Sequence, residues 1–142
     1  MKDGTFEKIS RSDTPMYGPE KLLLCGFPAG AQSKFAKVLE RSGLAQIPIV
    51  WANHENAGQT LSALLELPDG TGSGLDSTLP RAVIVSGITE NQLHSLMAVC
   101  RKSGMQQALW AALTPTSETW ALDQLLGELN KERKALSGRK GK

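Results

Sequence analysis

Short apolar runs alternate along the chain with segments of helical periodicity, and glycine or proline residues separate them. Continuous apolar runs over residues 21–27 and 82–88 predict strands that are buried on both faces. Residues 47–51 and 108–113 predict two further strands. Pro48 cannot donate to a sheet ladder, so we place the strand over 47–51 at an edge of the sheet.

Between the strands, apolar residues recur every three or four positions, which is typical of helices with one buried face. The pattern predicts one helix over residues 29–42 and a second over residues 53–67. Thr89 and Gln92 form a capping-box pattern that predicts the start of a third helix. Pro115 suits the first position of a fourth helix, because no backbone N–H is needed there.

The two halves of the chain align without a gap at an offset of 61 positions. The alignment places Gly26 on Gly87 and Leu61 on Leu122, so residues with structural roles coincide. We interpret the halves as two βαβα pseudo-repeats. We expect residues 1–20 to form a flexible arm and residues 134–142 to form a disordered basic tail. Between them, residues 21–133 should form one α/β domain. Its two repeats span residues 21–67 and 81–133, and a flexible linker over 68–80 joins them.

Two βαβα units predict an α/β fold, a four-stranded and mostly parallel sheet with helices packed on it. Right-handed crossovers favour the strand order 2-1-3-4. The first and third strands would then lie in the centre, and their carboxyl ends would meet in a crevice of the kind that binds ligands in open α/β sheets. A ferredoxin-like α+β sandwich is the alternative, if an edge strand runs antiparallel.

The second half carries a recognisable series of residues. A strand ends in Ser86-Gly87, a later strand leads into Leu-Thr-Pro-Thr at residues 113–116, and Trp120 precedes a Leu-Leu-x-Glu-Leu helix over residues 125–129. Over about residues 80–133, the chain resembles an uncharacterised bacterial family known only as a domain of unknown function. The first half looks similar to the degenerate lobe that often precedes this domain. This family has no established activity, so the resemblance gives no expectation about function.

Composition narrows the functional classes. Hydrophobic residues make up 40% and charged residues 21% of the 142 residues, which is ordinary for a globular domain. The net charge is +2, but residues 131–142 hold six basic side chains against one acidic side chain. We interpret this segment as a solubilising tail and expect no nucleic-acid partner, because the basic residues lack interleaved aromatic residues.

The same features bear on location. The chain has no apolar run of roughly 18 residues, so we expect no membrane-spanning helix. The first 20 residues lack the apolar segment of a secretory signal. We therefore expect a cytoplasmic protein in which Cys25 and Cys100 are free thiols.

No catalytic constellation is evident. His54 and His94 are the only histidines, and neither belongs to a cluster with the spacing of metal ligands. Cys25 and Cys100 fit buried positions better than they fit the role of nucleophile. We expect no metal and no cofactor, and we lean against an enzyme.

Two features remain as candidate sites. Glycines at strand ends and hydroxyl groups at helix starts are suited to binding anions. As a candidate anion site we name Gly26, Phe27, Gly87, Thr89, Thr114, Thr116 and Ser117. The competing interpretation is that the hydroxyl groups only cap their own helices.

Trp120 is the second feature. Trp120 lies in the predicted fourth helix, and at 100° per residue it points about 160° away from the core residue Leu122. An outward Trp favours a contact surface. The leading hypothesis is a non-enzymatic protein-interaction or regulatory module, with self-association into a homodimer or binding to another protein. The alternative is a domain that binds a small anionic ligand in the crevice between the first and third strand ends.

Overall fold

In the computed structural model, which describes residues 13–105 and 108–140, four strands form one sheet in the order β2-β1-β3-β4. The strands are β1 (Lys21–Cys25), β2 (Ile49–Ala52), β3 (Ala82–Ser86) and β4 (Leu109–Ala112). β2 runs parallel to β1 and β4 runs parallel to β3, whereas the central strands β1 and β3 are antiparallel. The predicted α/β fold and strand order are confirmed, with a mixed sheet that is mostly parallel.

The antiparallel central pair shows that the expected crevice was wrong. Because β1 and β3 run in opposite directions, their carboxyl ends lie at opposite ends of the sheet. Gly26 lies against Pro80, just before β3, and Gly87 lies against Pro19, just before β1. The buried apolar runs that mark these strands carry no information about direction. The ferredoxin-like alternative does not apply either, because both edge strands run parallel to their neighbours.

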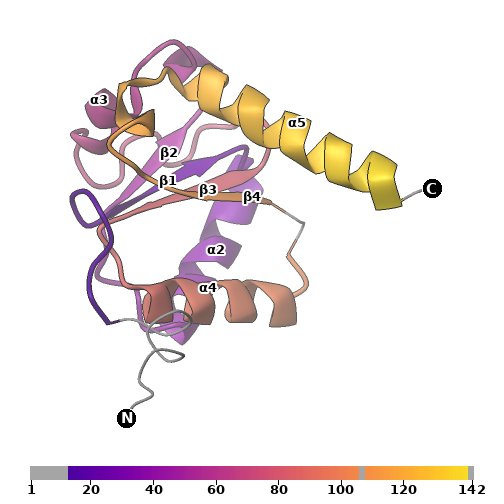
Figure 1. Ribbon diagram of the computed structural model, residues 1–142. Helices are drawn as coiled ribbons and strands as arrows, with labels where there is room; N and C mark the ends of the chain where they lie inside the picture. Colours follow the sequence, from indigo (N-terminus) through magenta and orange to yellow (C-terminus); the bar gives the residue numbers. More distant parts are fainter. Residues whose placement is uncertain (1–12, 106–107, 141–142) are drawn as a thin grey trace.

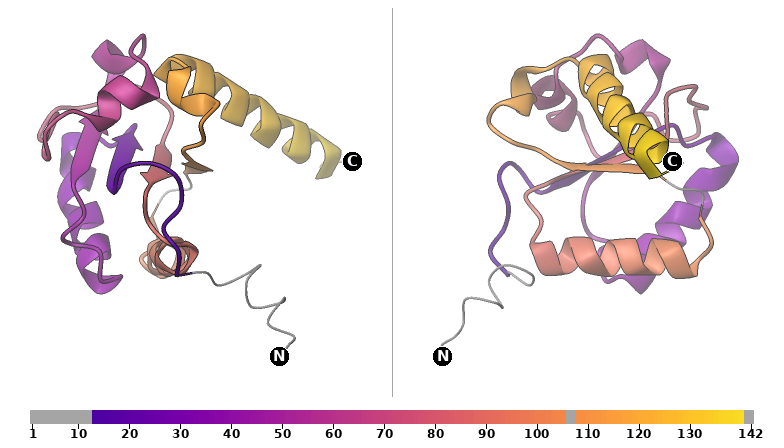
Figure 2. Two further views of the ribbon diagram at one scale, coloured as in Figure 1. Left: turned by 60° about the vertical axis from the view of Figure 1, so that its left-hand side comes forward. Right: turned by 45° about the vertical axis from the view of Figure 1, so that its right-hand side comes forward.

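Helices cover both faces of the sheet (Figure 1). One face carries α2 (Ala29–Arg41) and α4 (Glu90–Lys102), and the other carries α3 (Leu61–Leu65) and the first part of α5 (Leu122–Lys140). Figure 2 shows the C-terminal part of α5 extending beyond the sheet. We call these the α2/α4 face and the α3/α5 face.

The two helices expected to follow β2 and β4 are each interrupted. The 3₁₀ turns η1 (His54–Asn56) and η2 (Ser117–Thr119) come first, and α3 and α5 start only afterwards. Between η1 and α3, and again between η2 and α5, the chain is extended, because these two segments hydrogen-bond to each other. The Leu61 N–H donates to the Trp120 carbonyl at 3.0 Å, and the Leu122 N–H donates to the Gln59 carbonyl at 2.9 Å. A continuous helix would use these groups internally.

Strand alternation divides the core into two layers. Leu22 and Leu24 point to the α2/α4 face, while Leu23 and Cys25 point to the α3/α5 face, and all four are fully buried. An edge-to-face cluster of Phe27, Phe35 and Trp51 lies within the α2/α4 layer.

The offset of 61 positions also relates the geometry of the two halves. Leu23 lies opposite Ile84 in the central pair, and Thr60 bridges to Ala121. The helix ends match too. The Leu44 N–H donates to the Leu39 carbonyl at 2.8 Å after α2, and the Met105 N–H donates to the Cys100 carbonyl at 3.3 Å after α4. The halves are therefore arranged about an approximate twofold axis, while their origin by duplication stays a prediction.

The connecting segments contact this framework. In the arm, the Met16 N–H donates to the Ile88 carbonyl, and residues 1–12 lie outside the described residues. In the linker over 68–80, the Asp76 carboxylate accepts from the Ala29 N–H at the start of α2 (2.7 Å). α5 continues to Lys140, through most of the segment expected to be a disordered tail, and residues 141–142 are not described.

Candidate functional site

The residues named as a candidate anion site divide between the two ends of the sheet. Gly26 and Phe27 follow β1, beside the start of β3. Gly87 and Thr89 follow β3 at the opposite end, where Thr89 bridges to Pro15 of the arm. The remaining three follow β4, which is parallel to β3: Thr114, Thr116 and Ser117. These residues therefore do not form one site.

At the second of these ends, the hydroxyl groups are used locally. Thr89 accepts from the Gln92 N–H at 3.0 Å, and the Gln92 side chain accepts from the Thr89 N–H at 2.8 Å, as the capping-box pattern predicted. The Thr114 hydroxyl accepts from the Ser117 N–H at 3.0 Å, and the Ser117 hydroxyl accepts from the Thr114 N–H at 3.1 Å. Thr116 is exposed and makes no capping hydrogen bond with its side chain. Four backbone N–H groups and three hydroxyl groups that could hold an anion are thus already bonded within the protein.

The expected position of Trp120 was wrong. Trp120 lies before α5 in an extended conformation (φ −80°, ψ 148°), so the angle between residues of one helix does not describe its direction. Its side chain is half-buried and packs against the core of the α3/α5 face. The protein itself thus covers much of this residue.

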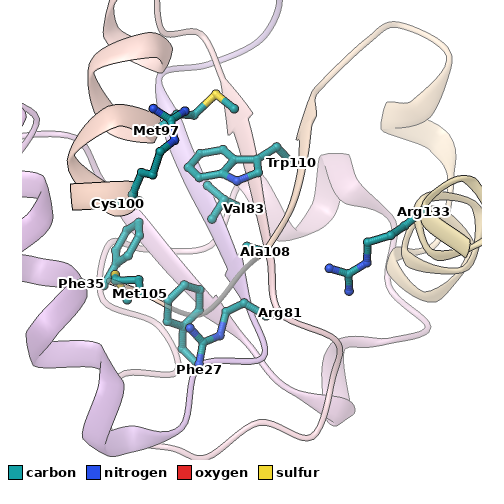
Figure 3. A pocket seen from close by; sticks show the side chains of 11 residues that line it. Phe27, Phe35, Arg81, Val83, Met97, Cys100, Met105, Ala108, Trp110 and Arg133 are labelled. Carbon is teal, nitrogen blue, oxygen red and sulfur yellow. The ribbon is translucent and has the colours of Figure 1, made fainter. Parts of the chain in front are cut away.

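A pocket of about 500 Å³ lies on the α2/α4 face, near the edge formed by β3 and β4. We call it the arginine pocket. Its walls are mostly apolar or sulfur-containing side chains from β3, β4, α2, α4 and the adjoining turns: Phe27, Phe35, Val83, Met97, Cys100, Met105, Ala108 and Trp110. Figure 3 shows Phe27 and Arg81 together at one end and Met97 beside Trp110 at the other.

Three guanidinium groups complete the lining: Arg81, Arg101 and Arg133. The Arg81 guanidinium lies 4.3 Å from the centre of the Phe27 ring, and its Nε donates to the Gly26 carbonyl at 3.0 Å. Burial lowers the pKa of Arg81 from its usual value, yet an arginine stays charged at neutral pH. Arg101 and Arg133 are exposed, and Arg133 reaches from α5 toward the pocket (Figure 3).

None of these arginines has an acidic partner within the described part of the chain. The salt bridge found there joins Lys131 to Glu128 on the exposed side of α5. In Arg81, the hydrogen bond to the Gly26 carbonyl engages Nε, and no described residue accepts from the two terminal nitrogens. The pocket therefore concentrates positive charge beside an apolar wall.

A comparison of the two halves explains why this space is open. Position by position at the offset of 61, Leu39 corresponds to Cys100 and Ile47 corresponds to Ala108. Leu39 and Ile47 are each only 2% exposed and fill the layer between α2 and β2. Cys100 and Ala108 have smaller side chains, and they leave the equivalent space between α4 and β4 unfilled.

The charges differ between the halves at the same place. Glu20 and Glu40 occupy the positions that correspond to Arg81 and Arg101. The second half thus differs from the first in both volume and sign of charge around the pocket. These differences fit a role for the pocket that its counterpart does not have.

Cys100 forms part of the wall, and Cys25 lies on the opposite face of the sheet. Burial raises the pKa of Cys100 to about 11 and that of Cys25 to about 12. Both thiols are therefore protonated near neutral pH and act as small apolar groups.

Other kinds of site find no support in the described residues. Among the described side chains, which span residues 13–105 and 108–133, no group of three His, Cys, Asp or Glu is placed to hold a metal ion. Over residues 13–105 and 108–140, no helix combines the length and apolar character needed to cross a bilayer.

Sequence reasoning found part of this pocket and missed the rest. Phe27 lines it and Gly26 orients Arg81, and both were named for a different site. Arg81 and Trp110 were missed because each looks like an ordinary residue at a strand end or edge. The usable signal was the pairing of Ile47 with Ala108 in the aligned halves, since a large core residue against a small one marks a possible void.

A comparison with known protein families matches the second half of the chain to a family that has no assigned activity. Residues 81–136 match the model of a family described as a domain of unknown function (DUF3783), close to the segment expected from the resemblance. Searches of curated proteins and of solved structures found no match. The matched segment contributes most of the residues that line the arginine pocket, whereas Phe27 and Phe35 come from the first half.

Proposed function

We propose that this protein is a binding module for a small organic anion, which it holds in the arginine pocket. The observation that carries the proposal is the set of three guanidinium groups around an apolar space of about 500 Å³, with no acidic partner among the described residues. Ligand pockets typically measure about 300–1,000 Å³ and combine apolar walls with a few placed polar groups. The proposed anion site is therefore the arginine pocket, and not the crevice between the first and third strand ends that the sequence led us to expect.

Arg81 is the best-positioned of the three for recognition. Its contact with Phe27 and its hydrogen bond to the Gly26 carbonyl restrain the side chain before any ligand arrives. A restrained guanidinium loses less conformational entropy on binding than a free one. It can donate both terminal N–H₂ groups to a carboxylate, sulfonate or phosphate, and such charge-assisted bonds are stronger than neutral ones.

The role as a protein-interaction or regulatory module was expected from the missing catalytic constellation and from an outward Trp120. The half-buried Trp120 side chain packs against the protein's own core, which weakens the second ground, and the role itself stays a prediction. Self-association, protein partners and cytoplasmic location stay predictions. No catalytic role is proposed for the pocket, because partial burial raises the pKa of the Cys100 thiol in its wall and so favours the protonated form.

A thermal-shift screen over organic anions tests the proposal, with three proteins run side by side: wild type, Arg81→Gln and Arg41→Gln. Arg41 is an exposed arginine in the last turn of α2 and serves as the matched control for lost charge. A ligand at 100 times its Kd stabilises a folded protein by about 2.7 kcal/mol. We expect at least one anion to raise the Tm of wild type and of Arg41→Gln, and to raise that of Arg81→Gln much less. Equal shifts in all three proteins, or no shift with any anion, would contradict the proposal.

A further inference from the structure

The side chains that line the arginine pocket differ in which hydrogen-bonding role they can take. Among the described lining residues, the polar groups are three guanidiniums, the Trp110 indole N–H and the Cys100 thiol. Guanidinium and indole groups only donate hydrogen bonds, and a thiol is at best a weak acceptor. The described lining includes no carboxylate, amide or hydroxyl side chain. The nearby Gly26 carbonyl already accepts from Arg81.

This one-sided lining selects the ligand. A ligand hydroxyl, amine or ammonium would lose its bonds to water and find no acceptor among the described lining side chains in return, which costs free energy for each such group. An ammonium would also face three like charges. Sugars, amino acids and nucleobases with exocyclic amines therefore fit poorly. A ligand whose polar atoms are all acceptors fits well.

The apolar wall narrows the class further. Phe27 and Phe35 stack edge to face with ring centres 5.0 Å apart, and Trp110 lines the same pocket. An aromatic ring of a ligand can add further edge-to-face or offset contacts to this cluster, and methionine sulfur also packs favourably on aromatic rings. Met97 and Met105 supply that sulfur. A flat aromatic body thus makes better use of this wall than a flexible acyl chain, which would lose more conformational entropy on binding.

Building on the proposed anion-binding function, we propose that the ligand is an aromatic acid: an apolar aromatic body that bears a carboxylate or a similar anionic group and no hydrogen-bond donors. The acidic group binds the terminal nitrogens of Arg81, and the ring system lies toward Trp110. Arg133, which reaches in from α5, adds charge at the open side of the pocket (Figure 3).

The experiment uses 8-anilinonaphthalene-1-sulfonate as the bound probe on the full chain. It is an aromatic anion whose fluorescence rises in apolar surroundings, and its single N–H group donates to its own neighbouring sulfonate, so it needs no acceptor from the pocket. Four competitors displace it: 1-naphthoate, its neutral ester methyl 1-naphthoate, octanoate and AMP. The ester has the same ring and no donor, so it isolates the charge. We expect 1-naphthoate to act at about tenfold lower concentration than the ester or more, because charge-assisted hydrogen bonds are lost. Octanoate and AMP should compete more weakly than 1-naphthoate.

Two variants separate the possible failures. Cys100→Leu combined with Ala108→Ile fills the pocket with the side chains of the first half, and Arg81→Gln keeps the pocket but removes the anchoring charge. Stronger competition by AMP or octanoate than by 1-naphthoate, with probe binding still lost in both variants, overturns the ligand class and leaves the anion site standing. Equal competition by the ester and the acid also overturns the class. Equal probe binding by wild type and both variants overturns the proposed function itself.

Discussion

Filling the arginine pocket from within is the most direct perturbation of the site. Ala108→Ile places in the second half the residue that stands at the equivalent position of the first, where Ile47 is 2% exposed. The change adds three carbon atoms, and a buried CH₂ group contributes about 0.8 kcal/mol, so the upper limit of the gain is about 2.4 kcal/mol. Cavity-filling changes commonly yield about 0.5–2 kcal/mol because the fit is incomplete. We expect a gain of about 1 kcal/mol.

The opposite change provides the matched control. Ile47→Ala opens the equivalent space in the first half, where the layer between α2 and β2 is packed. Large-to-small changes of this kind in a core cost about 2–5 kcal/mol. The two variants thus make the same exchange in opposite directions, in similar surroundings, and only the first has a void to fill.

Urea denaturation followed by circular dichroism measures both effects. A gain of 1 kcal/mol corresponds to a rise in Tm of about 4 °C for a domain of this size. In the same samples, Ala108→Ile should lose binding of 8-anilinonaphthalene-1-sulfonate, while Ile47→Ala should keep it at the arginine pocket. Overpacking of a filled core costs about 1–3 kcal/mol, so a loss of that size in Ala108→Ile would refute the reasoning. It would mean that side chains already fill the space around Ala108.

Three further predictions concern other residues. In a urea titration, Gly74→Ala should lower the free energy of unfolding by about 1 kcal/mol, and Gly72→Ala should lower it by much more. Both glycines have positive φ, but only at Gly72 would a Cβ atom collide with the Trp51 carbonyl oxygen. Equal losses of unfolding free energy in the two variants would contradict this. In a mass-spectrometric time course at pH 8, Cys100 should react with iodoacetamide about 100-fold more slowly than an ordinary thiol, because its pKa is about 11 instead of 9.0. Reaction at the ordinary rate would show that the Cys100 thiol is not shielded from water. Trp120→Ala should lower the free energy of unfolding by about 1–3 kcal/mol without altering the mass measured by light scattering, and a changed mass with full stability would restore the interface hypothesis.

Local signals carried most of the fold. The capping box of Thr89 and Gln92 places the start of α4 correctly, because both partners lie within one helical turn. Pro48 places β2 at an edge because it lacks an N–H, and the structure has β2 at an edge. In such cases the residues that decide the geometry are neighbours in the chain, so their identity is sufficient evidence.

The errors came from interactions between the two halves. The direction of β3 relative to β1 depends on how one βαβα unit packs on the other, and no local pattern encodes it. Similarly, η2 and α5 are separate because Leu61 and Leu122 bond to backbone carbonyls across the twofold axis. The interruption also reversed the conclusion about Trp120, since an angle calculated for a continuous helix does not apply to an extended residue.

The arginine pocket illustrates how a comparison of matched halves can point to a candidate site. Positions that keep the same kind of residue in both halves, such as Gly43 and Gly104 with φ of 79° and 69°, serve geometry that both halves need. Positions at which the two halves differ do not serve this shared geometry, so the residue there can reflect something that only one half does. The exchange of Ile47 for Ala108 removes core volume, and on packing grounds alone such an exchange is costly. The smaller side chain at Ala108 stands beside the positive charge of Arg81, where the first half has Glu20. A bound anion that occupies the space, as the proposed function has it, accounts for both differences together, whereas packing alone accounts for neither.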